Sequence, residues 1–191
     1  MIFGTAKRLE CVVSENAVAP MRPLKTPRLV LEPQVTAHAD EMFLVLGDPA
    51  IYEFENAPPA SIEALRERYR TLESRQSPDG RQLWLNWVVR LSDGGRAIGY
   101  VQATVLAEGR ALIAYEFGSA WWGRGYAHEA TVVALRELHE SCGVTTVGAV
   151  FKQTNHRSRA LLERLGLRPI GPAEFPGALR EADEAAMVMS L

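Results

Sequence analysis

Cysteine is scarce in this sequence, and the signals of a secreted protein are missing with it. The two cysteines, Cys11 and Cys142, form no paired spacing, and no Asn-x-Ser/Thr glycosylation site occurs. The first twenty residues also lack the continuous apolar core of a signal peptide. A disulfide framework is therefore disfavoured, and we expect a reducing, cytoplasmic setting.

Long apolar runs and metal motifs are missing too. No stretch approaches the ~20 apolar residues that a membrane span requires. His128 and His139 are each followed by glutamate, but neither has the second histidine that a zinc-protease helix carries four positions on. We therefore expect neither membrane association nor a metal site.

Neither sign of charge predominates. Lysine and arginine number 21 against 23 aspartates and glutamates, and the two kinds are interspersed along the chain. Without a basic block, the sequence does not favour binding to DNA or RNA. With 191 residues, of which 47% are apolar, the chain is long enough for one well-buried domain and too short for two ordinary ones.

The main positive signal is a pair of glycines between a strand-like segment and an amphipathic helix. Glycine lets the main chain approach a bulky anion, because no Cβ intervenes. The helix that follows directs its unpaired N–H groups, and the positive end of its dipole, at the same point. A backbone site for pyrophosphate is therefore expected at Gly123, Arg124, Gly125, Tyr126 and Ala127.

Better-known phosphate loops do not fit this segment. The Walker string Gly-x-x-x-x-Gly-Lys-Ser/Thr does not occur in the chain. The dinucleotide fingerprint Gly-x-Gly-x-x-Gly would need glycine at His128, and it opens an early βαβ unit rather than one in mid-chain. Both nucleotide interpretations are therefore disfavoured.

The pattern of apolar residues predicts an α+β domain over residues 24–191, preceded by an N-terminal extension, residues 1–23, that we expect to be poorly ordered. Helical spacing predicts helices over 36–46, 61–74, 124–141 and 155–166, and alternation predicts strands over 24–31, 83–91, 97–105, 111–118, 145–151, 168–171 and 185–191. The three strands between 83 and 118 should form an antiparallel meander. The strand, helix and strand that follow should form a right-handed parallel crossover.

Four motifs in this order resemble one known family. They are Leu-Lys-Thr-Pro-Arg-Leu-Val-Leu at 24–31, Ile-Gly-Tyr at 98–100, Trp-Gly-Arg-Gly-Tyr-Ala-x-Glu-Ala at 122–130, and Asn-x-x-Ser-x-x-Leu-Leu-Glu-Arg-Leu-Gly-Leu at 155–167. The combination is similar to the GNAT superfamily of acetyl-CoA-dependent N-acetyltransferases, and within it to the branch of ribosomal-protein N-terminal alanine and serine acetyltransferases. The resemblance implies a three-layer domain with a mixed, mainly antiparallel central sheet, splayed at the acyl-CoA site, and helices on both faces.

The resemblance also implies where acetyl-CoA, as co-substrate, is bound. The family's loop usually begins with glutamine or arginine, where this chain has Ala120, so backbone amides should provide most of the binding. Phe117 and Gly118, at the end of the strand beside the pantetheine arm, are candidates for main-chain contact with the pantetheine and thioester. Asn155 would contact the pantetheine, and Ser158 would donate to the departing thiolate. A helix cap at Asn155 and a solvent-facing Ser158 are the alternatives.

Glu116 is the candidate general base, because it lies in an otherwise apolar strand where partial burial raises the pKa of a carboxyl group. A carboxylate at a strand edge that reaches solvent or an arginine is the alternative. Glu53 and Glu55 lie in the loop where this branch admits its acceptor, and they would bind a substrate ammonium. Trp121 is either part of the acceptor cleft or a packing residue.

These residues together predict an N-acetyltransferase that moves acetyl directly from acetyl-CoA to a primary amine. An α-amine with a pKa of ~8 is roughly one-tenth neutral at pH 7, whereas a lysine is neutral only about once in a few thousand molecules. A site without an obvious strong base therefore favours a protein N-terminal α-amine as acceptor. A polyamine, an amino acid or an aminoglycoside is the next possibility. A non-catalytic acyl-CoA-binding module and a nucleotide-binding regulator are the alternatives from other classes, and we expect a monomer or a homodimer.

Overall fold

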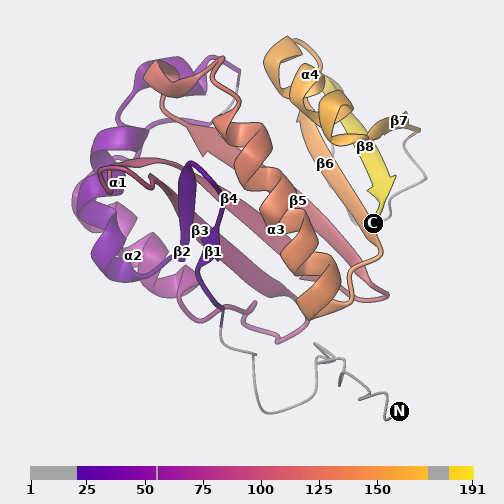
Figure 1. Ribbon diagram of the computed structural model, residues 1–191, viewed down its shortest axis with the longest axis horizontal. Coiled ribbons are helices and arrows are strands. Elements are labelled where there is room, and N and C mark those ends of the chain that lie inside the picture. The colour runs from indigo at the N-terminus through magenta and orange to yellow at the C-terminus, as the bar shows by residue number, and fades with distance from the viewer. Residues whose placement is uncertain (1–20, 55, 172–180) are drawn as a thin grey trace.

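A computed structural model describes residues 21–54, 56–171 and 181–191. In these ranges the strands form one eight-stranded sheet in the order β1-β2-β3-β4-β5-β6-β8-β7, with helices on both faces (Figure 1). Every neighbouring pair is antiparallel except β5 and β6. This is the mixed, mainly antiparallel α+β architecture expected from the sequence. Most of the expected extension (residues 1–20), residues 172–180 and Glu55 lie outside the described residues.

The elements have the following bounds. The strands are β1 (Leu24–Lys25), β2 (Leu29–Pro33), β3 (Leu83–Leu91), β4 (Ala97–Leu106), β5 (Arg110–Phe117), β6 (Thr146–Lys152), β7 (Arg168–Ile170) and β8 (Glu184–Ser190). The α-helices are α1 (Ala39–Leu46), α2 (Ile62–Leu72), α3 (Tyr126–Cys142) and α4 (His156–Leu165), and the 3-10 turns are η1 (Thr36–His38), η2 (Pro49–Tyr52) and η3 (Ser119–Trp121).

The first strand differs from the expectation. Residues 24–31 form not one strand but a tight hairpin, in which Leu24 of β1 is opposite Leu31 of β2. Pro27 lies in the turn, where its missing N–H costs no ladder hydrogen bond. The turn is closed by the Thr26 amide, which donates to the Leu29 carbonyl at 2.9 Å, and by the Leu29 amide, which donates to Thr26 Oγ1 at 2.9 Å.

Two residues from the expected extension contact the domain. Met21 packs against the main core, and the Arg22 guanidinium pairs with Glu137 of α3 at 2.6 Å. The side chains of residues 21 and 22 therefore already belong to the folded part of the chain.

The helices follow their sequence signals closely. The Ser61 hydroxyl caps α2 by accepting from the Ala64 amide at 3.1 Å. Helix α3 begins at Tyr126 rather than at 124, because Gly125 has the left-handed φ of 78° and so stands outside the helix as its N-cap. At the other end, Gly143 ends the helix with a φ of 64°.

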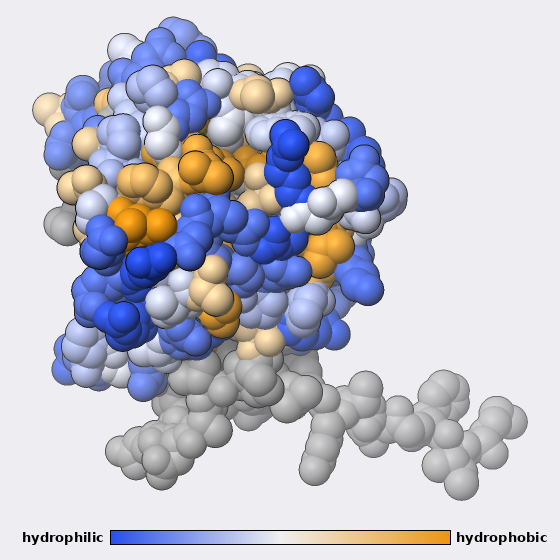
Figure 2. Space-filling model, turned by 90° about the vertical axis from the view of Figure 1, so that its left-hand side faces the viewer, coloured by the Kyte–Doolittle hydropathy of each residue, from blue (hydrophilic) through white to orange (hydrophobic). Residues whose placement is uncertain are grey.

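Two hydrophobic cores lie on opposite faces of the sheet. The larger joins β1 to β6 with α3, and it includes Trp87, Val101 and Leu138. The smaller joins β3 and β4 with α1 and α2, and it includes Met42 and Val88. Figure 2 looks onto the side of α1 and α2, where a largely hydrophilic surface is interrupted by small hydrophobic patches. Both faces are thus covered by amphipathic helices, which makes three layers. No helix in the described ranges has the length and apolar character to cross a membrane.

The sheet opens between β5 and β6. These strands pair in parallel only from Arg110 to Leu112 on β5, although β5 continues to Phe117 and β6 to Lys152. Beyond Leu112 the two strands diverge, and the turn into α3 begins at the diverging end of β5 (Figure 1). The sheet is therefore splayed as expected.

Candidate active site

The glycine loop presents open backbone at the start of α3. Gly123 and Gly125 have φ values of 72° and 78°, which favour glycine. A Cβ at Gly123 would meet nothing within 4 Å, and one at Gly125 would meet Arg28 Nη2 at 3.5 Å. No side chain of the described residues caps the helix, since Gly125 is its N-cap. The N–H groups of the first turn, Tyr126 and Ala127 among them, therefore remain available to an anion, which is the site that the sequence predicts.

An ion pair fixes this loop to the first hairpin. Glu129, in the first turn of α3, accepts from Thr26 Oγ1 at 2.5 Å and from Arg28 Nε at 2.6 Å. Arg28 Nη1 also donates to the Arg124 carbonyl at 3.0 Å, and the guanidinium lies 4.6 Å from the centre of the Tyr126 ring. Burial alone would raise the pKa of the Glu129 carboxyl, but the hydrogen bonds from Thr26 and Arg28 outweigh it and lower the pKa.

These contacts give a structural reason for two of the sequence motifs. Thr26 and Arg28 belong to the first motif and Glu129 to the third, and the sequence analysis gave none of them a role. The signal available in the sequence was the charge pair alone, which does not reveal that residues 101 positions apart meet.

Arg124 and Trp121 lie beside the loop. The Arg124 guanidinium is 5.3 Å from the centre of the Trp121 ring, and Trp121 meets the Tyr126 ring edge to face at 6.3 Å. Trp121 is also packed against the main core. Its place in the acceptor cleft stays a prediction.

The end of β5 carries the two residues expected to contact the thioester arm. The Gly118 amide donates to the Ile98 carbonyl at 3.0 Å, so this N–H is used inside the sheet. In an antiparallel ladder the adjacent residue turns its backbone groups to the other side. The Phe117 backbone therefore points towards the diverging β6, and its carbonyl accepts from Trp122 Nε1 at 2.7 Å.

Asp48 supports the same strand end and was missed in the sequence. Its Oδ2 accepts from the Ser119 amide at 2.7 Å, and its Oδ1 accepts from Ala50 at 3.0 Å. Hydrogen bonds from Ser119 hold the pKa of Asp48 below its usual value. Aspartate before proline is a typical N-cap, so the sequence does signal the contact with Ala50, but it carries no signal for the contact with Ser119.

Helix α4 brings Asn155 and Ser158 to the splayed part of the sheet. Asn155 Oδ1 accepts from the Ser158 amide at 2.9 Å, which is the capping role held open as an alternative. Ser158 does not simply face solvent, because its Oγ lies 3.0 Å from the hydroxyl of Tyr115 on β5. Tyr115 is a residue that the sequence analysis did not single out.

Glu116 lies on the opposite face of β5 from Tyr115. It is directly across from Tyr100 of β4, on the side that α1 and α2 cover. Burial, followed by the charge of Glu116, raises the pKa of Tyr52 to about 12 and raises that of Tyr100 well above its usual value. Burial also raises the pKa of Tyr69, with Glu116 adding a smaller contribution in the same direction. Three phenols that stay neutral at pH 7 therefore feel the charge of Glu116.

Glu53 is engaged by a residue from α4. Arg157 Nη2 lies 2.6 Å from Glu53 Oε2, and its guanidinium is 4.3 Å from the centre of the Trp122 ring and 5.3 Å from that of Phe54. The pair joins the segment before α2 to the start of α4. The second acidic candidate, Glu55, lies outside the described residues.

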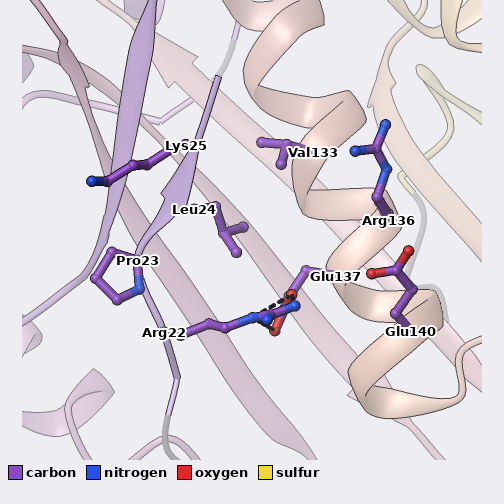
Figure 3. Close-up of a pocket in the computed structure, with 8 residues that line it drawn as sticks. All are labelled: Arg22, Pro23, Leu24, Lys25, Val133, Arg136, Glu137 and Glu140. Atoms are coloured by element: carbon purple, nitrogen blue, oxygen red, sulfur yellow. Dashed lines mark hydrogen bonds and ion pairs between the residues drawn. The ribbon is translucent and has the colours of Figure 1, made fainter. Parts of the chain in front are cut away.

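Two surface hollows lie away from these residues. One, of about 270 Å³, is lined by residues 22–25 and by α3 from Val133 to Glu140, and it contains the Arg22–Glu137 pair (Figure 3). The other, of about 330 Å³, lies between α3, the end of α4 and β8. Within the described ranges no three His, Cys, Asp or Glu side chains gather in a way that would hold a metal ion.

A family model for the acetyltransferase (GNAT) domain matches residues 28–168, which include the glycine loop and α4. The chain belongs to the GNAT acetyltransferase family. The uncharacterized N-acetyltransferase YoaA of Bacillus subtilis is 24% identical to this GNAT chain over 153 residues, which cover 78% of this chain and 84% of YoaA. The expected family, the expected fold and an enzyme of acetyl transfer are thereby confirmed.

Solved GNAT structures share the fold. RimL, a ribosomal L7/L12 α-N-protein acetyltransferase in complex with coenzyme A, matches with a TM-score of 0.75 and 12% identity, over 89% of this chain and 98% of that one. MccE, a microcin C7 self-immunity acetyltransferase in complex with acetyl-CoA and AMP, matches with a TM-score of 0.71 and 16% identity, over 87% of this chain and 94% of that one.

Proposed function

We propose that this GNAT enzyme transfers acetyl directly from acetyl-CoA to a protein N-terminal α-amine. The observation that carries the proposal is the open, uncapped start of α3 at the diverging end of β5. The pyrophosphate of acetyl-CoA would accept hydrogen bonds from the first-turn amides of α3, where the glycines leave room for it. Acetyl-CoA supplies the activated acetyl group, as a thioester whose thiolate can leave.

The pantetheine arm would lie in the splay between β5 and β6. The Phe117 backbone points into the divergence and is our candidate for main-chain contact with the arm and thioester, whereas the Gly118 amide is already used by Ile98. Asn155 can serve both as a cap and as a contact. Its Oδ1 is engaged by Ser158, and its side-chain NH₂ group remains a donor for the arm.

The two proton-handling groups lie on opposite faces of the same strand. Glu116 faces α1 and α2, while Tyr115, next in the chain, faces Ser158 on α4. An amine held on the Glu116 side would attack the carbonyl while the thiolate leaves on the Ser158 side. The separation of base and donor across the strand fits direct transfer between amine and thioester.

Glu116 is the best-placed base in its cluster. Tyr52, Tyr69 and Tyr100 stay protonated at neutral pH, because burial and the Glu116 charge raise each phenol's pKa. A carboxylate among neutral phenols attracts the acceptor's ammonium and can then take its proton. A carboxylate base suits an α-amine, roughly one-tenth of which is already neutral at pH 7, better than it suits lysine.

A small-molecule amine is the second candidate acceptor. The fold likeness to MccE is close to that with RimL, so the fold does not separate the two classes. Glu53 and Trp121 would contribute to binding of either acceptor. The cytoplasmic setting and the monomeric or homodimeric state stay predictions.

The test is release of free thiol from acetyl-CoA with a panel of peptide N-termini, polyamines, amino acids and aminoglycosides. We expect the highest kcat/KM with peptides, together with N-terminal acetylation by mass spectrometry. Faster turnover of a small amine would transfer the assignment to that class. Tight binding of coenzyme A with no turnover on any amine would favour a non-catalytic module.

A matched pair of glycine variants tests the loop itself. Gly125 and Gly143 stand at opposite ends of α3 with similar left-handed backbones. Gly125→Glu should abolish coenzyme A binding in calorimetry, because bulk and like charge reach the phosphates. Gly143→Glu carries the same backbone strain and should bind normally. Equal loss in both variants would refute the loop as the binding site.

A further inference from the structure

Tyr115 occupies a place from which it can act on the thioester side of the site. Pairing between β5 and β6 ends at Leu112, and Tyr115 lies three positions further along the diverging strand. Its side chain faces α4, since its hydroxyl lies 3.0 Å from Ser158 Oγ. The two residues are 43 positions apart in sequence, so this contact is made by the fold alone.

The Ser158 hydroxyl is held in a defined position from two sides. Asn155 Oδ1 accepts the Ser158 amide at 2.9 Å and fixes the first turn of α4. The Tyr115 hydroxyl has two acceptors on the same serine, Oγ at 3.0 Å and the carbonyl oxygen at 3.5 Å, of which Oγ is the nearer. If the phenol donates to Oγ, the proton of the serine hydroxyl is free to point elsewhere.

We propose that Tyr115 is a positioning residue, whose O–H donates to Ser158 Oγ and so directs the Ser158 O–H at the sulfur of coenzyme A. This inference rests on the proposed function, since it takes Ser158 as the group beside the departing thiolate. No bond to hydrogen breaks in the pair. Both hydroxyls keep their protons, and the thiolate gains one hydrogen bond as its negative charge develops.

The acid strengths agree with a hydrogen bond rather than a proton transfer. Burial raises the pKa of Tyr115 to about 12, although the Ser158 hydrogen bond and the charge of Arg164 act in the opposite direction. A thiol has a pKa of about 8.5, so a proton would not pass from the phenol to the thiolate spontaneously. The phenol therefore stays a neutral donor across the working pH range.

The experiment measures the pKa of the thiol of bound coenzyme A, by the ultraviolet absorbance of the thiolate during a pH titration. Wild type should lower this pKa relative to free coenzyme A, and Tyr115→Phe should raise it again by about one unit, which corresponds to a tenfold weaker preference for the thiolate. Acetyl transfer at saturating acetyl-CoA should fall by a similar factor, with the Kd of acetyl-CoA little changed.

Three further variants make the result specific. Ser158→Ala should shift the thiol pKa at least as much as Tyr115→Phe, and the double variant should shift it no further than Ser158→Ala alone. Ser74→Ala removes a hydroxyl just after α2, outside the proposed site, and should leave the thiol pKa unchanged. A shift in Tyr115→Phe that adds fully to that of Ser158→Ala would overturn the proposal.

The failure of this inference can be told from failure of the proposed function. Binding of coenzyme A with the same thiol pKa in wild type and Tyr115→Phe overturns the positioning role alone. No binding of coenzyme A by wild type overturns both.

Discussion

At the scale of single residues, Glu129 joins two segments that are about 100 positions apart in the sequence. One carboxylate accepts from the Thr26 hydroxyl, the Arg28 amide and the Arg28 guanidinium, and so joins the first hairpin to the start of α3. Its side chain is 18% exposed, and that of Arg28 is 47% exposed. Because solvent screens the half-exposed Arg28, the attraction between the two charges itself adds little to the free energy of folding. The main effect of the pair is to hold the glycine loop in position.

The lowered pKa of Glu129 predicts how stability depends on pH. A carboxyl whose folded pKa is lowered stabilises the fold above its unfolded pKa of about 4.3, and that contribution is lost as the pH falls through the folded value. Glu129→Gln should therefore lower the free energy of unfolding at pH 7 by about 2 kcal/mol, and the difference from wild type should shrink towards pH 3. Urea unfolding at both pH values measures it.

Glu63→Gln is the control for this prediction, because the Glu63 side chain is 73% exposed on α2. It should change stability by less than about 0.5 kcal/mol at either pH. A Glu129→Gln deficit that is the same at pH 7 and pH 3 would show that the charge of Glu129 is not responsible.

At the scale of elements, the helix ends could be predicted from the sequence because the residues that form them are close together in the chain. Asn155 and Gly166 cap the two ends of α4, close to the bounds of 155–166 that the sequence predicted. Such ends can be predicted because capping depends on a side chain or a backbone angle within a few residues of the helix end. The hairpin at Pro27 was missed because two short strands and their turn have the same apolar pattern as one longer strand.

The contacts that complete the site had no local signal. Asp48 meets Ser119 across 71 positions, and Tyr115 meets Ser158 across 43. No periodicity encodes such pairs. They arise only when the fold brings the end of β5 close to Asp48, after α1, and to the start of α4.

Because β4 and β5 pack closely at Gly99, adding a single methyl group there should destabilise the fold. A Cβ at Gly99 would lie 2.3 Å from the Glu116 carbonyl oxygen and 2.8 Å from Phe117 Cα, which is backbone that must move. Gly99→Ala should therefore destabilise the fold by about 1–3 kcal/mol, and weaken coenzyme A binding because the end of β5 shifts. Thermal unfolding and calorimetry measure the two effects.

Gly94→Ala, in the turn before the same strand, is the matched control, since a Cβ there meets nothing within 4 Å. It should leave both quantities close to wild type. Normal stability in Gly99→Ala would mean that the two strands are not in this close contact.

At the scale of the whole molecule, the sheet consists of two parts held together at one end. Strands β1 to β5 and strands β6, β8 and β7 join through three residue pairs between β5 and β6. A ligand in the divergence would contact both parts. It should therefore stabilise the fold as a whole, beyond its effect on the loop that binds its phosphates.

Saturating coenzyme A is predicted to raise the melting temperature. At a hundred times its Kd, a ligand that binds only the folded state adds about 2.7 kcal/mol, which corresponds to a shift of roughly 5–10 °C for a chain of this size. ATP and NAD at the same concentration should give smaller shifts. A larger shift with either nucleotide, in the same thermal scan, would instead support a nucleotide-binding regulator.

If Glu53 receives the acceptor's ammonium as proposed, the acceptor would compete with Arg157, the cation already paired with Glu53. An amine that brings its charge to Glu53 must displace a guanidinium that is permanently tethered nearby. Because both side chains are about half exposed, at 51% and 55%, the pair contributes about 0.2–1 kcal/mol, or at most about a fivefold bias. An amine that binds only through its charge would lose this free energy of binding in full. A peptide could offset the loss through hydrogen bonds of its backbone. On this proposal, discrimination against the simplest amines would begin at Glu53, before the amine reaches the thioester.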